Sequence, residues 1–194
     1  GKSTIAVNLA AALSRSGLKT GLLDVDIHGP NVPKLLKLDS TRLEVRGETL
    51  IPATYGALKV MSLGFLIARQ DDAIIWRGPL KMGVIQQFIR DVDWGRLDWL
   101  VVDCPPGTGD EPLSIAQIFK SDVISVIVTT PQDLAQMDSR KAVTFCRQLK
   151  IPVIGLIENM SGFTCPYCSK VVDIFKTGGG KRMADEMNIP FLGA

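Results

Sequence analysis

Short, almost wholly apolar runs recur along the sequence and constrain its fold more than any other feature. They read "TGLLDVD", "LKVMSLG", "LDWLVVD", "VISVIVTT", "IPVIGLIEN" and "IPFLG". Strands buried on both faces have this composition, and they belong to parallel sheets covered by helices. Helical patterns such as "PLKMGVIQQFIRDV" and "DSRKAVTFCRQLK" separate most of the runs. The alternation predicts an α/β fold with a doubly wound, mainly parallel sheet flanked by helices.

The stretch "LEVRGETLIPA" departs from this pattern, because two short runs flank a turn at Gly47, and it predicts a hairpin at the sheet edge. The sequence contains no repeat and no linker, so we expect residues 1–194 to form a single domain. The chain opens on "GKST" with no strand before it and stops inside the apolar run "IPFLGA". We therefore expect the sequence to be the interior of a longer chain.

Composition and charge narrow the class of partner. The chain has 194 residues, of which 46% are hydrophobic, and a net charge of +2. This balance requires neither a nucleic acid nor an anionic membrane as partner. No uninterrupted apolar run reaches the roughly 18 residues of a membrane span. We expect a cytoplasmic protein that binds neither nucleic acid nor membrane.

The opening residues have the form of the end of a phosphate-binding loop, in which backbone amides and a helix N-terminus hold phosphates. Gly1 would contribute to the loop, and Lys2 would reach the β- and γ-phosphates of a nucleotide. The Ser3 hydroxyl would bind Mg²⁺, and the Thr4 hydroxyl would reach the α-phosphate. The alternative is ordinary helix capping.

A second segment supports the nucleotide interpretation. In "LVVDCPPG" an apolar strand ends in the acid Asp103, as in the second half of many Mg-nucleotide sites. The backbone amide of Gly107, four residues later, would face the γ-phosphate. Together with "GKST", this segment favours a nucleotide site over turns with a purely structural role.

Cys165 and Cys168 form a CxxC pair in "FTCPYCSK", which we expect in a loop after a late strand. A structural zinc ribbon needs two such pairs in one chain, and a thioredoxin-like pair would open a helix after the first strand. A two-fold dimer reaches four thiolates by adding the same cysteines from a second copy. Four thiolates suit either zinc or an iron-sulfur cluster, and a redox or structural pair is the remaining alternative.

The sequence resembles the Mrp/ApbC family of P-loop ATPases, iron-sulfur cluster carriers related to the MinD and ParA proteins. The resemblance covers nearly the whole chain and rests on "GKST", "GLLDVDIHGPNVPKLL", "MSLGF", "WRGP", "VDWGRLDWLVVDCPPGTGDE", "TTPQDLAQMDSRKAV", "GLIENMSGFTCPYC" and "DIFKTGGGKRMADEM". It implies a P-loop ATPase fold, a homodimer that pairs over two nucleotides, and slow hydrolysis of ATP. The signature lysine of the family's loop would lie before residue 1.

The resemblance also implies roles for individual residues. Asp26 would orient the attacking water in the first switch, and Asp24 and Asp103 would lie near Mg²⁺, directly or through water. Gly107 would belong to the second switch, and the Asn159 side chain would read adenine. The alternative for Asp24 and Asn159 is a turn or cap role.

For the cysteine pair, the resemblance selects a [4Fe-4S] cluster, shared across the dimer and passed to apo iron-sulfur proteins. The leading hypothesis is therefore an ATP-dependent iron-sulfur cluster carrier with ATP, Mg²⁺ and the cluster as ligands. One rival is a positioning ATPase of the MinD or ParA kind without metal. The other is a nucleotide-gated scaffold with structural zinc.

Several residues carry weaker signals. His28 lies in the expected first switch, where a solvated side chain is the simpler interpretation, and Arg77 in "WRGP" has no assigned task. Cys104 and Cys146 are expected to be buried, inert thiols. The triple glycine at 178–180 is expected to be a flexible entry to a helix.

Overall fold

The computed structural model describes residues 1–26, 29–66, 78–172 and 176–194, and the chain forms two compact units. We name them after their candidate site residues. The aspartate-bearing unit contains Ser3–Pro105 and Gly109–Ile118. The cysteine-bearing unit contains Gly1–Lys2, Pro106–Thr108 and Phe119–Ala194.

The aspartate-bearing unit is built on a four-stranded sheet. Its strands, in spatial order, are β4 (Ala53–Tyr55), β5 (Leu58–Ser62), β1 (Thr20–Asp24) and β6 (Trp99–Asp103). The central strand β1 is parallel to both of its neighbours, whereas β4 is antiparallel to β5. All residues of β1 are buried, as the apolar run predicted. The carboxyl ends of β1, β5 and β6 therefore lie at one edge of the sheet.

The helices of this unit are α1 (Lys2–Arg15), α2 (Val32–Leu35), α3 (Gly78–Arg90) and α4 (Asp110–Phe119), and a 3₁₀ turn spans Leu63–Leu66. Helix α1 packs on the sheet through Val7 and Ala10, which join a core cluster with Leu22 of β1 and Val60 of β5. This packing fixes the long helix that begins with the "KST" residues against the central strand.

The predicted edge hairpin is present as β2 (Glu44–Arg46) and β3 (Thr49–Ile51), which pair antiparallel around Gly47 with φ +64°. Leu50 of β3 attaches the hairpin to the segment after α3, because its N–H donates to the Asp91 carbonyl and its carbonyl accepts the Asp93 N–H. A hairpin was predicted correctly, but it forms a two-stranded sheet of its own, and one edge of the four-stranded sheet is the short strand β4, which was not predicted.

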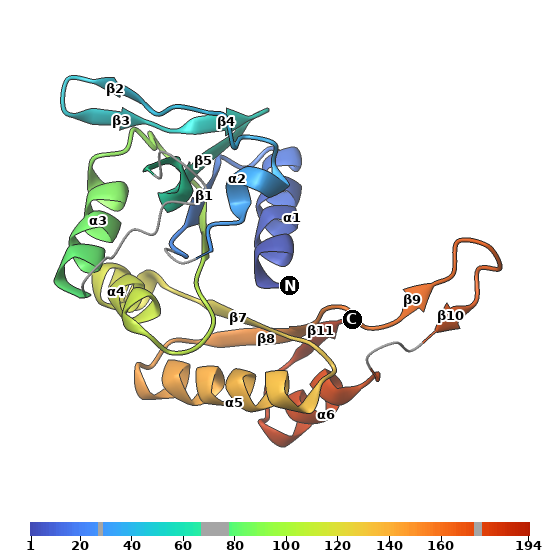
Figure 1. Ribbon diagram of the computed structural model, residues 1–194. Helices are drawn as coiled ribbons and strands as arrows, with labels where there is room; N and C mark the ends of the chain where they lie inside the picture. The colour runs from blue at the N-terminus through green and yellow to red at the C-terminus, as the bar shows by residue number, and fades with distance from the viewer. Residues whose placement is uncertain (27–28, 67–77, 173–175) are drawn as a thin grey trace. The chain divides into compact units, whose positions relative to one another are not determined.

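The cysteine-bearing unit has a sheet in the order β11 (Phe191–Gly193), β8 (Val153–Glu158) and β7 (Ser125–Thr129), and all its strands are parallel. A 3₁₀ turn spans Lys120–Asp122. Helices α5 (Asp133–Gln148) and α6 (Gly179–Glu186) lie along this sheet, α5 against β7 and α6 against β8 (Figure 1). Both predicted helices and all three predicted strands of this unit are confirmed.

The segment expected to be a loop around the cysteine pair contains a short antiparallel hairpin, β9 (Phe163–Thr164) and β10 (Val171–Val172). Each strand has two residues, which is too short for an alternating pattern to appear in the sequence. Cys165 and Cys168 lie in the connection between the two strands. Figure 1 shows the hairpin extending away from α5 and α6.

Within the described part of the chain, no helix has both the length and the apolar character that crossing a membrane requires.

Candidate functional site

Asp24 ends β1 as a buried carboxylate with defined partners. Its Oδ1 accepts the Asp26 N–H at 3.1 Å, and its Oδ2 accepts the Ser62 hydroxyl at 3.0 Å and the Val32 N–H at 3.3 Å. These bonds hold the turn after β1, the end of β5 and the first residue of α2 together. Asp24 therefore makes the contacts of a turn or cap residue, which was the alternative to a role near Mg²⁺. The same contacts hold its carboxylate at the carboxyl end of β1.

Asp103 ends β6 directly beside Asp24, because the two residues are register partners of the parallel pair β1–β6. Burial raises the pKa of Asp24 to about 7, and the negative charge of Asp103 adds to the rise. Hydrogen bonds from Asp26, Ser62 and Val32 act in the opposite direction without cancelling it. Two buried carboxyl groups in this register repel one another when both are ionised.

Asp26 lies two residues beyond the strand and is half-buried. Its Oδ1 accepts the Gly29 N–H at 3.1 Å, which closes a turn after the strand end. The side chain therefore stands at the carboxyl end of β1 with an oriented carboxylate. His28, and Arg77 of "WRGP", lie outside the described residues.

The residues of "GKST" begin helix α1. Lys2 and Ser3 are half-buried, and Thr4 is exposed in the first turn. The first N–H groups of a helix have no partner within it, and the helix dipole places partial positive charge there. A helix of 14 residues beginning with a lysine and two hydroxyl side chains has the composition of a phosphate site.

Gly107 lies in the exposed connection that follows β6 and has φ +93°. A Cβ at this position would meet no atom within 4 Å, so the backbone conformation, rather than space, favours glycine here. Asn159 follows β8. Its Nδ2 donates to the Gly1 carbonyl at 3.0 Å, and its Oδ1 accepts the Met160 N–H at 2.8 Å. Asn159 thus makes the contacts of a turn residue, which was the alternative to adenine binding, and these contacts hold it beside Gly1.

The cysteine pair occupies the turn of the β9–β10 hairpin. The Cys165 N–H donates to the Lys170 carbonyl and the Cys165 carbonyl accepts the Ser169 N–H, both at 2.9 Å. Hydrogen bonds from the backbone N–H groups of Tyr167 and Cys168, and from the Cys168 thiol, lower the pKa of Cys165. The thiolate is the form that binds a metal, so the turn prepares Cys165 for that task.

The hairpin turn supplies two thiols, those of Cys165 and Cys168. Among the residues that the structure describes, no group of three or more His, Cys, Asp or Glu side chains could hold a metal. None of the four cysteines, all of which the structure describes, forms a disulfide. Cys146 is buried on α5 as expected, whereas Cys104 is half-buried and follows the end of β6 rather than lying within it.

Residues 1–194 match the ParA family described as NUBPL iron-transfer P-loop NTPases. The chain belongs to this family. An iron-sulfur cluster carrier protein of Methanocaldococcus jannaschii is 50% identical over 194 residues, which are 100% of this chain and 67% of the relative. The cytosolic Fe-S cluster assembly factor CFD1 of Kluyveromyces lactis is 44% identical over 200 residues, covering 100% of this chain and 71% of that protein. The predicted family resemblance is therefore confirmed.

Solved structures also match this iron-transfer NTPase chain. The nucleotide-binding protein of Archaeoglobus fulgidus in complex with ADP, in which cobalt was found, is 38% identical with a TM-score of 0.82, covering 98% of this chain and 74% of that one. MinD of Pyrococcus horikoshii with Mg-ADP is 19% identical with a TM-score of 0.63, covering 99% and 74%. The MinD likeness concerns the fold alone. The predicted α/β fold of the MinD/ParA type is confirmed.

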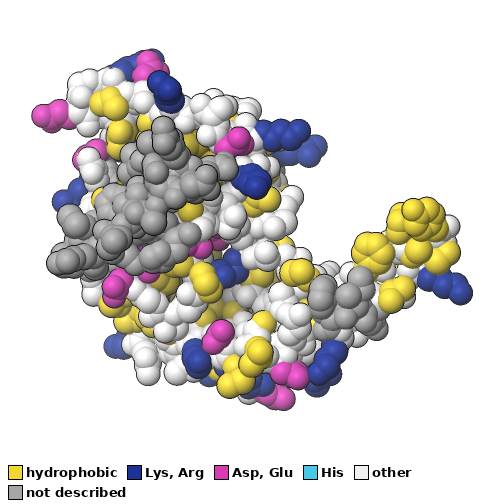
Figure 2. Space-filling view, viewed as in Figure 1, with side chains coloured by type: hydrophobic (Ala, Val, Ile, Leu, Met, Phe, Trp, Pro, Cys, Tyr) yellow, Lys and Arg dark blue, Asp and Glu magenta, His cyan; other side chains and the backbone are white. Residues whose placement is uncertain are grey.

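Exposed apolar side chains surround the thiols of this NTPase. Figure 2 shows hydrophobic side chains gathered on the hairpin, and Tyr167 between the two cysteines is 96% exposed. Val171 is 69% and Val172 50% exposed on β10, and Phe163 is 48% exposed on β9. A group of exposed apolar side chains of this kind is typical of a segment that meets another surface.

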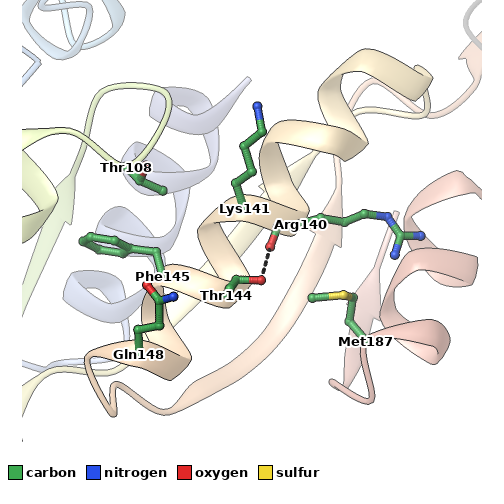
Figure 3. A pocket seen from close by; sticks show the side chains of 7 residues that line it. All are labelled: Thr108, Arg140, Lys141, Thr144, Phe145, Gln148 and Met187. Carbon is green, nitrogen blue, oxygen red and sulfur yellow. Dashed lines mark hydrogen bonds between the residues drawn. The ribbon is translucent and has the colours of Figure 1, made fainter.

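A separate pocket of about 380 Å³ lies along α5 and contains none of the residues predicted to form a site. Figure 3 shows Phe145 and Gln148 on the side of Thr108, and the Arg140 guanidinium extending toward Met187. Arg140 forms an ion pair with Glu186, and Lys141 one with Asp138. Both cations of the pocket thus already have anionic partners, so we assign it no ligand.

Two residues of the site were missed by the sequence interpretation. Ser62 binds Asp24 and in turn accepts the Gly64 N–H at 3.0 Å, so it links β5 to β1 at the strand ends. Glu158 was noted only as a polar residue at the end of a strand, but it is 1% exposed and accepts several hydrogen bonds. An acid or hydroxyl directly after an apolar run was the available signal for both.

Proposed function

We propose that this chain is an ATP-hydrolysing iron-sulfur cluster carrier of the cytoplasm. Two copies hold a [4Fe-4S] cluster between their Cys165 and Cys168 side chains and pass it to apo iron-sulfur proteins. The observation that carries the proposal is the CxxC pair in an exposed hairpin turn, with the pKa of Cys165 lowered. Relatives 44–50% identical are named as an iron-sulfur cluster carrier and an Fe-S cluster assembly factor, which supports it.

The number of thiols supports the dimer. A cluster of this kind is held by four thiolates, and one hairpin supplies two. A second copy related by a two-fold axis supplies the other two from the same surface. The exposed side chains of Phe163, Tyr167 and Val171 lie around the thiols, where two hairpins would meet. Burying them in the dimer would favour association and exclude water from the cluster.

The nucleotide contacts follow from the strand ends and the start of α1. Lys2 neutralises the β- and γ-phosphates, the N–H groups of α1 bind them, and Ser3 and Thr4 add hydroxyl contacts. Gly107 supplies a backbone N–H to the γ-phosphate. Asn159 binds adenine through its carboxamide group. The bonds to Gly1 and Met160 use one N–H of Nδ2 and one lone pair of Oδ1, so a second N–H and a second lone pair are available for the base.

The acidic residues fit a Mg²⁺ ion. Asp24 and Asp103 are buried register partners, and a divalent cation removes the repulsion between their charges. Together with the Ser3 hydroxyl they would hold Mg²⁺ directly or through water, and the ion would neutralise phosphate charge. The Asp26 carboxylate, oriented by its bond to Gly29, accepts a hydrogen bond from the attacking water and positions it. A site that works mainly by positioning gives slow turnover, with ATP acting as a switch between states.

The test is anaerobic reconstitution of the full chain with iron and sulfide. We expect about four iron and four sulfide ions per two chains, a dimer by native mass spectrometry, and transfer of the cluster to an apo iron-sulfur protein. The Cys165→Ser/Cys168→Ser double variant should lose the cluster and retain nucleotide binding. Ser169→Ala, in the same hairpin, is the matched control and should load normally.

A colourless protein that retains zinc after iron loading in cells would overturn the carrier proposal and favour the scaffold with structural zinc. Loading of a monomer with a full cluster would overturn the shared site.

A further inference from the structure

Glu158 is the last residue of β8 and lies seven positions before the first cysteine of the pair. Its carboxylate is almost fully enclosed, with 1% of the residue exposed. One oxygen, Oε1, accepts the Ser161 hydroxyl at 2.6 Å and the Gly178 N–H at 3.1 Å. The other, Oε2, accepts the Gly180 N–H. A single side chain thus contacts residues on both sides of the cysteine hairpin.

The partners of Glu158 bracket the hairpin in the sequence. Ser161 precedes β9 and Gly178 follows β10, so the carboxylate joins the point where the chain leaves the β8 strand to the point where it returns at α6. Within the described residues, the hairpin has two register pairs, Val171 with Thr164 and Val172 with Phe163. A two-stranded ribbon of this size is marginal in water without further support.

Close packing explains the glycines at the return point. A Cβ on Gly180 would lie 3.0 Å from both Cβ and Oε2 of Glu158. A Cβ on Gly179 would lie 3.0 Å from the Pro131 carbonyl oxygen, and Gly178 has φ +73°. The triple glycine, which the sequence interpretation regarded as a flexible helix entry, is therefore closely packed at its last two positions, Gly180 against Glu158 and Gly179 against Pro131.

Glu158 is ionised, and its negative charge strengthens the hydrogen bonds that it accepts. Burial by itself raises the pKa of a carboxyl group, but hydrogen bonds from Ser161, Gly180 and Gly178 and the charge of Arg182 outweigh it, so the pKa of Glu158 lies below its usual value. The carboxylate is ionised at neutral pH, and hydrogen bonds to an ionised acceptor are stronger than neutral ones.

We propose that Glu158 is a positioning residue that fastens both ends of the cysteine-bearing segment, residues 161–178, and so presents the two thiols for metal binding. The fastening stands on the contacts of Glu158 itself, and its effect on metal binding rests on the proposed function. Glu158 does not touch the metal. It acts by binding Ser161 and Gly178, the first and last residues of the segment, at the end of β8.

Hydrogen exchange of the full chain tests the fastening without metal. In Glu158→Gln the side-chain amide places an N–H where a backbone N–H now donates, so at least one bond is lost. We expect exchange of the Gly178 and Gly180 amides to become about tenfold faster or more, which corresponds to losing one net hydrogen bond. The control is Glu186→Gln, which changes an exposed acid of α6, the helix that contains Gly180. This variant should leave the exchange rates of both amides unchanged. Equal exchange in Glu158→Gln and the native chain would overturn the proposal.

Titration with Co²⁺ under anaerobic conditions, followed by the thiolate-to-cobalt absorption, tests the consequence for the thiols. We expect Glu158→Gln to bind Co²⁺ about tenfold more weakly than the native chain and Glu186→Gln to match the native chain. Faster exchange with unchanged Co²⁺ affinity would overturn the positioning role. A native chain that binds no Co²⁺ would count against the proposed function, while hydrogen exchange still decides on the fastening.

Ser161→Ala is a milder variant that keeps the proposal testable if Glu158→Gln does not fold. It removes only the hydroxyl on the entry side and leaves the buried carboxylate with both glycine N–H groups. We expect faster exchange across residues 161–165 and a smaller loss of Co²⁺ affinity than in Glu158→Gln. If Glu158→Gln unfolds and Ser161→Ala behaves as the native chain in both measurements, the proposal is wrong.

Discussion

Asp24 and Asp103 are register partners at the carboxyl ends of β1 and β6, and both carboxyl groups are buried. In this position one acid raises the proton affinity of the other, which is why the charge of Asp103 contributes to the raised pKa of Asp24. The pair is therefore more stable with one proton, or with a cation, than with two bare charges.

The stability of the chain without nucleotide or Mg²⁺ should depend on pH through Asp24. Its pKa rises from 3.8 to about 7 on folding, so between these values the folded state binds a proton that the unfolded state releases. The free energy of unfolding therefore falls as pH rises through this window, by at most about 4 kcal/mol. Urea unfolding at pH 5 and pH 8 measures the part of this fall that lies above pH 5, at most about 3 kcal/mol. Asp24→Asn should remove most of it and the exposed Asp39→Asn none; an unchanged slope in Asp24→Asn would contradict the assignment.

Lys2→Ala should abolish or severely weaken nucleotide binding. The ammonium group is assigned to the phosphates, and a hydrogen bond to a charged group contributes about 1.5–3 kcal/mol, or roughly 10- to 150-fold in affinity. Alanine favours helix, so α1 should stay intact. Isothermal titration with ATP and Mg²⁺ measures the loss, and Lys141→Ala on α5 is the control. ATP hydrolysis at the native rate in Lys2→Ala would refute the phosphate-loop assignment.

Asp26→Asn should bind ATP with nearly native affinity and hydrolyse it about 100-fold more slowly, in the range seen when a group that handles the attacking water is lost. Asparagine keeps the oxygen that accepts the Gly29 N–H, so the turn after β1 should persist. Single-turnover hydrolysis and equilibrium binding separate the two effects. Loss of ATP binding would instead identify Asp26 as a structural residue.

Two glycines in helices should respond in opposite directions to alanine. Gly179→Ala should lower the free energy of unfolding by about 1–3 kcal/mol, because its Cβ would crowd the Pro131 carbonyl oxygen. Gly83→Ala on α3 should raise it by up to about 1 kcal/mol, since its Cβ would meet no atom within 4 Å and alanine favours helix. Thermal unfolding of both variants tests the packing at the start of α6. A neutral Gly179→Ala would show that this close contact does not restrict the helix.

The sheets could be predicted from the sequence because buried parallel strands leave a strong apolar signal. The runs around Leu22 and Leu156 became central strands, and both residues are fully buried. The hairpin β9–β10 could not be predicted, because strands of two residues have no detectable period. Whether the chain forms one domain, as the sequence suggested, stays a prediction.

The candidate site was predictable where a polar residue directly follows an apolar run, as Asp24 and Asp103 do. Contacts set by register were not predictable: Ser62 reaches Asp24 only because β5 and β1 pair with these residues opposite one another. The contact of Glu158 with Gly178 joins residues 20 positions apart. The assigned roles of Lys2, Ser3, Asp26 and Asn159 in nucleotide binding stay predictions, as does the metal role of Cys165 and Cys168.

The short pairing of β9 with β10 bears on how the proposed cluster is released as well as on how it is bound. Two register pairs hold the strands of this hairpin in the part of the chain that the structure describes, whereas β7 and β8 share five. Pulling the hairpin apart therefore leaves the sheet of β7, β8 and β11 intact. Under the proposed carrier function, a cluster held by the Cys165 and Cys168 thiols could therefore be released while that sheet stays folded.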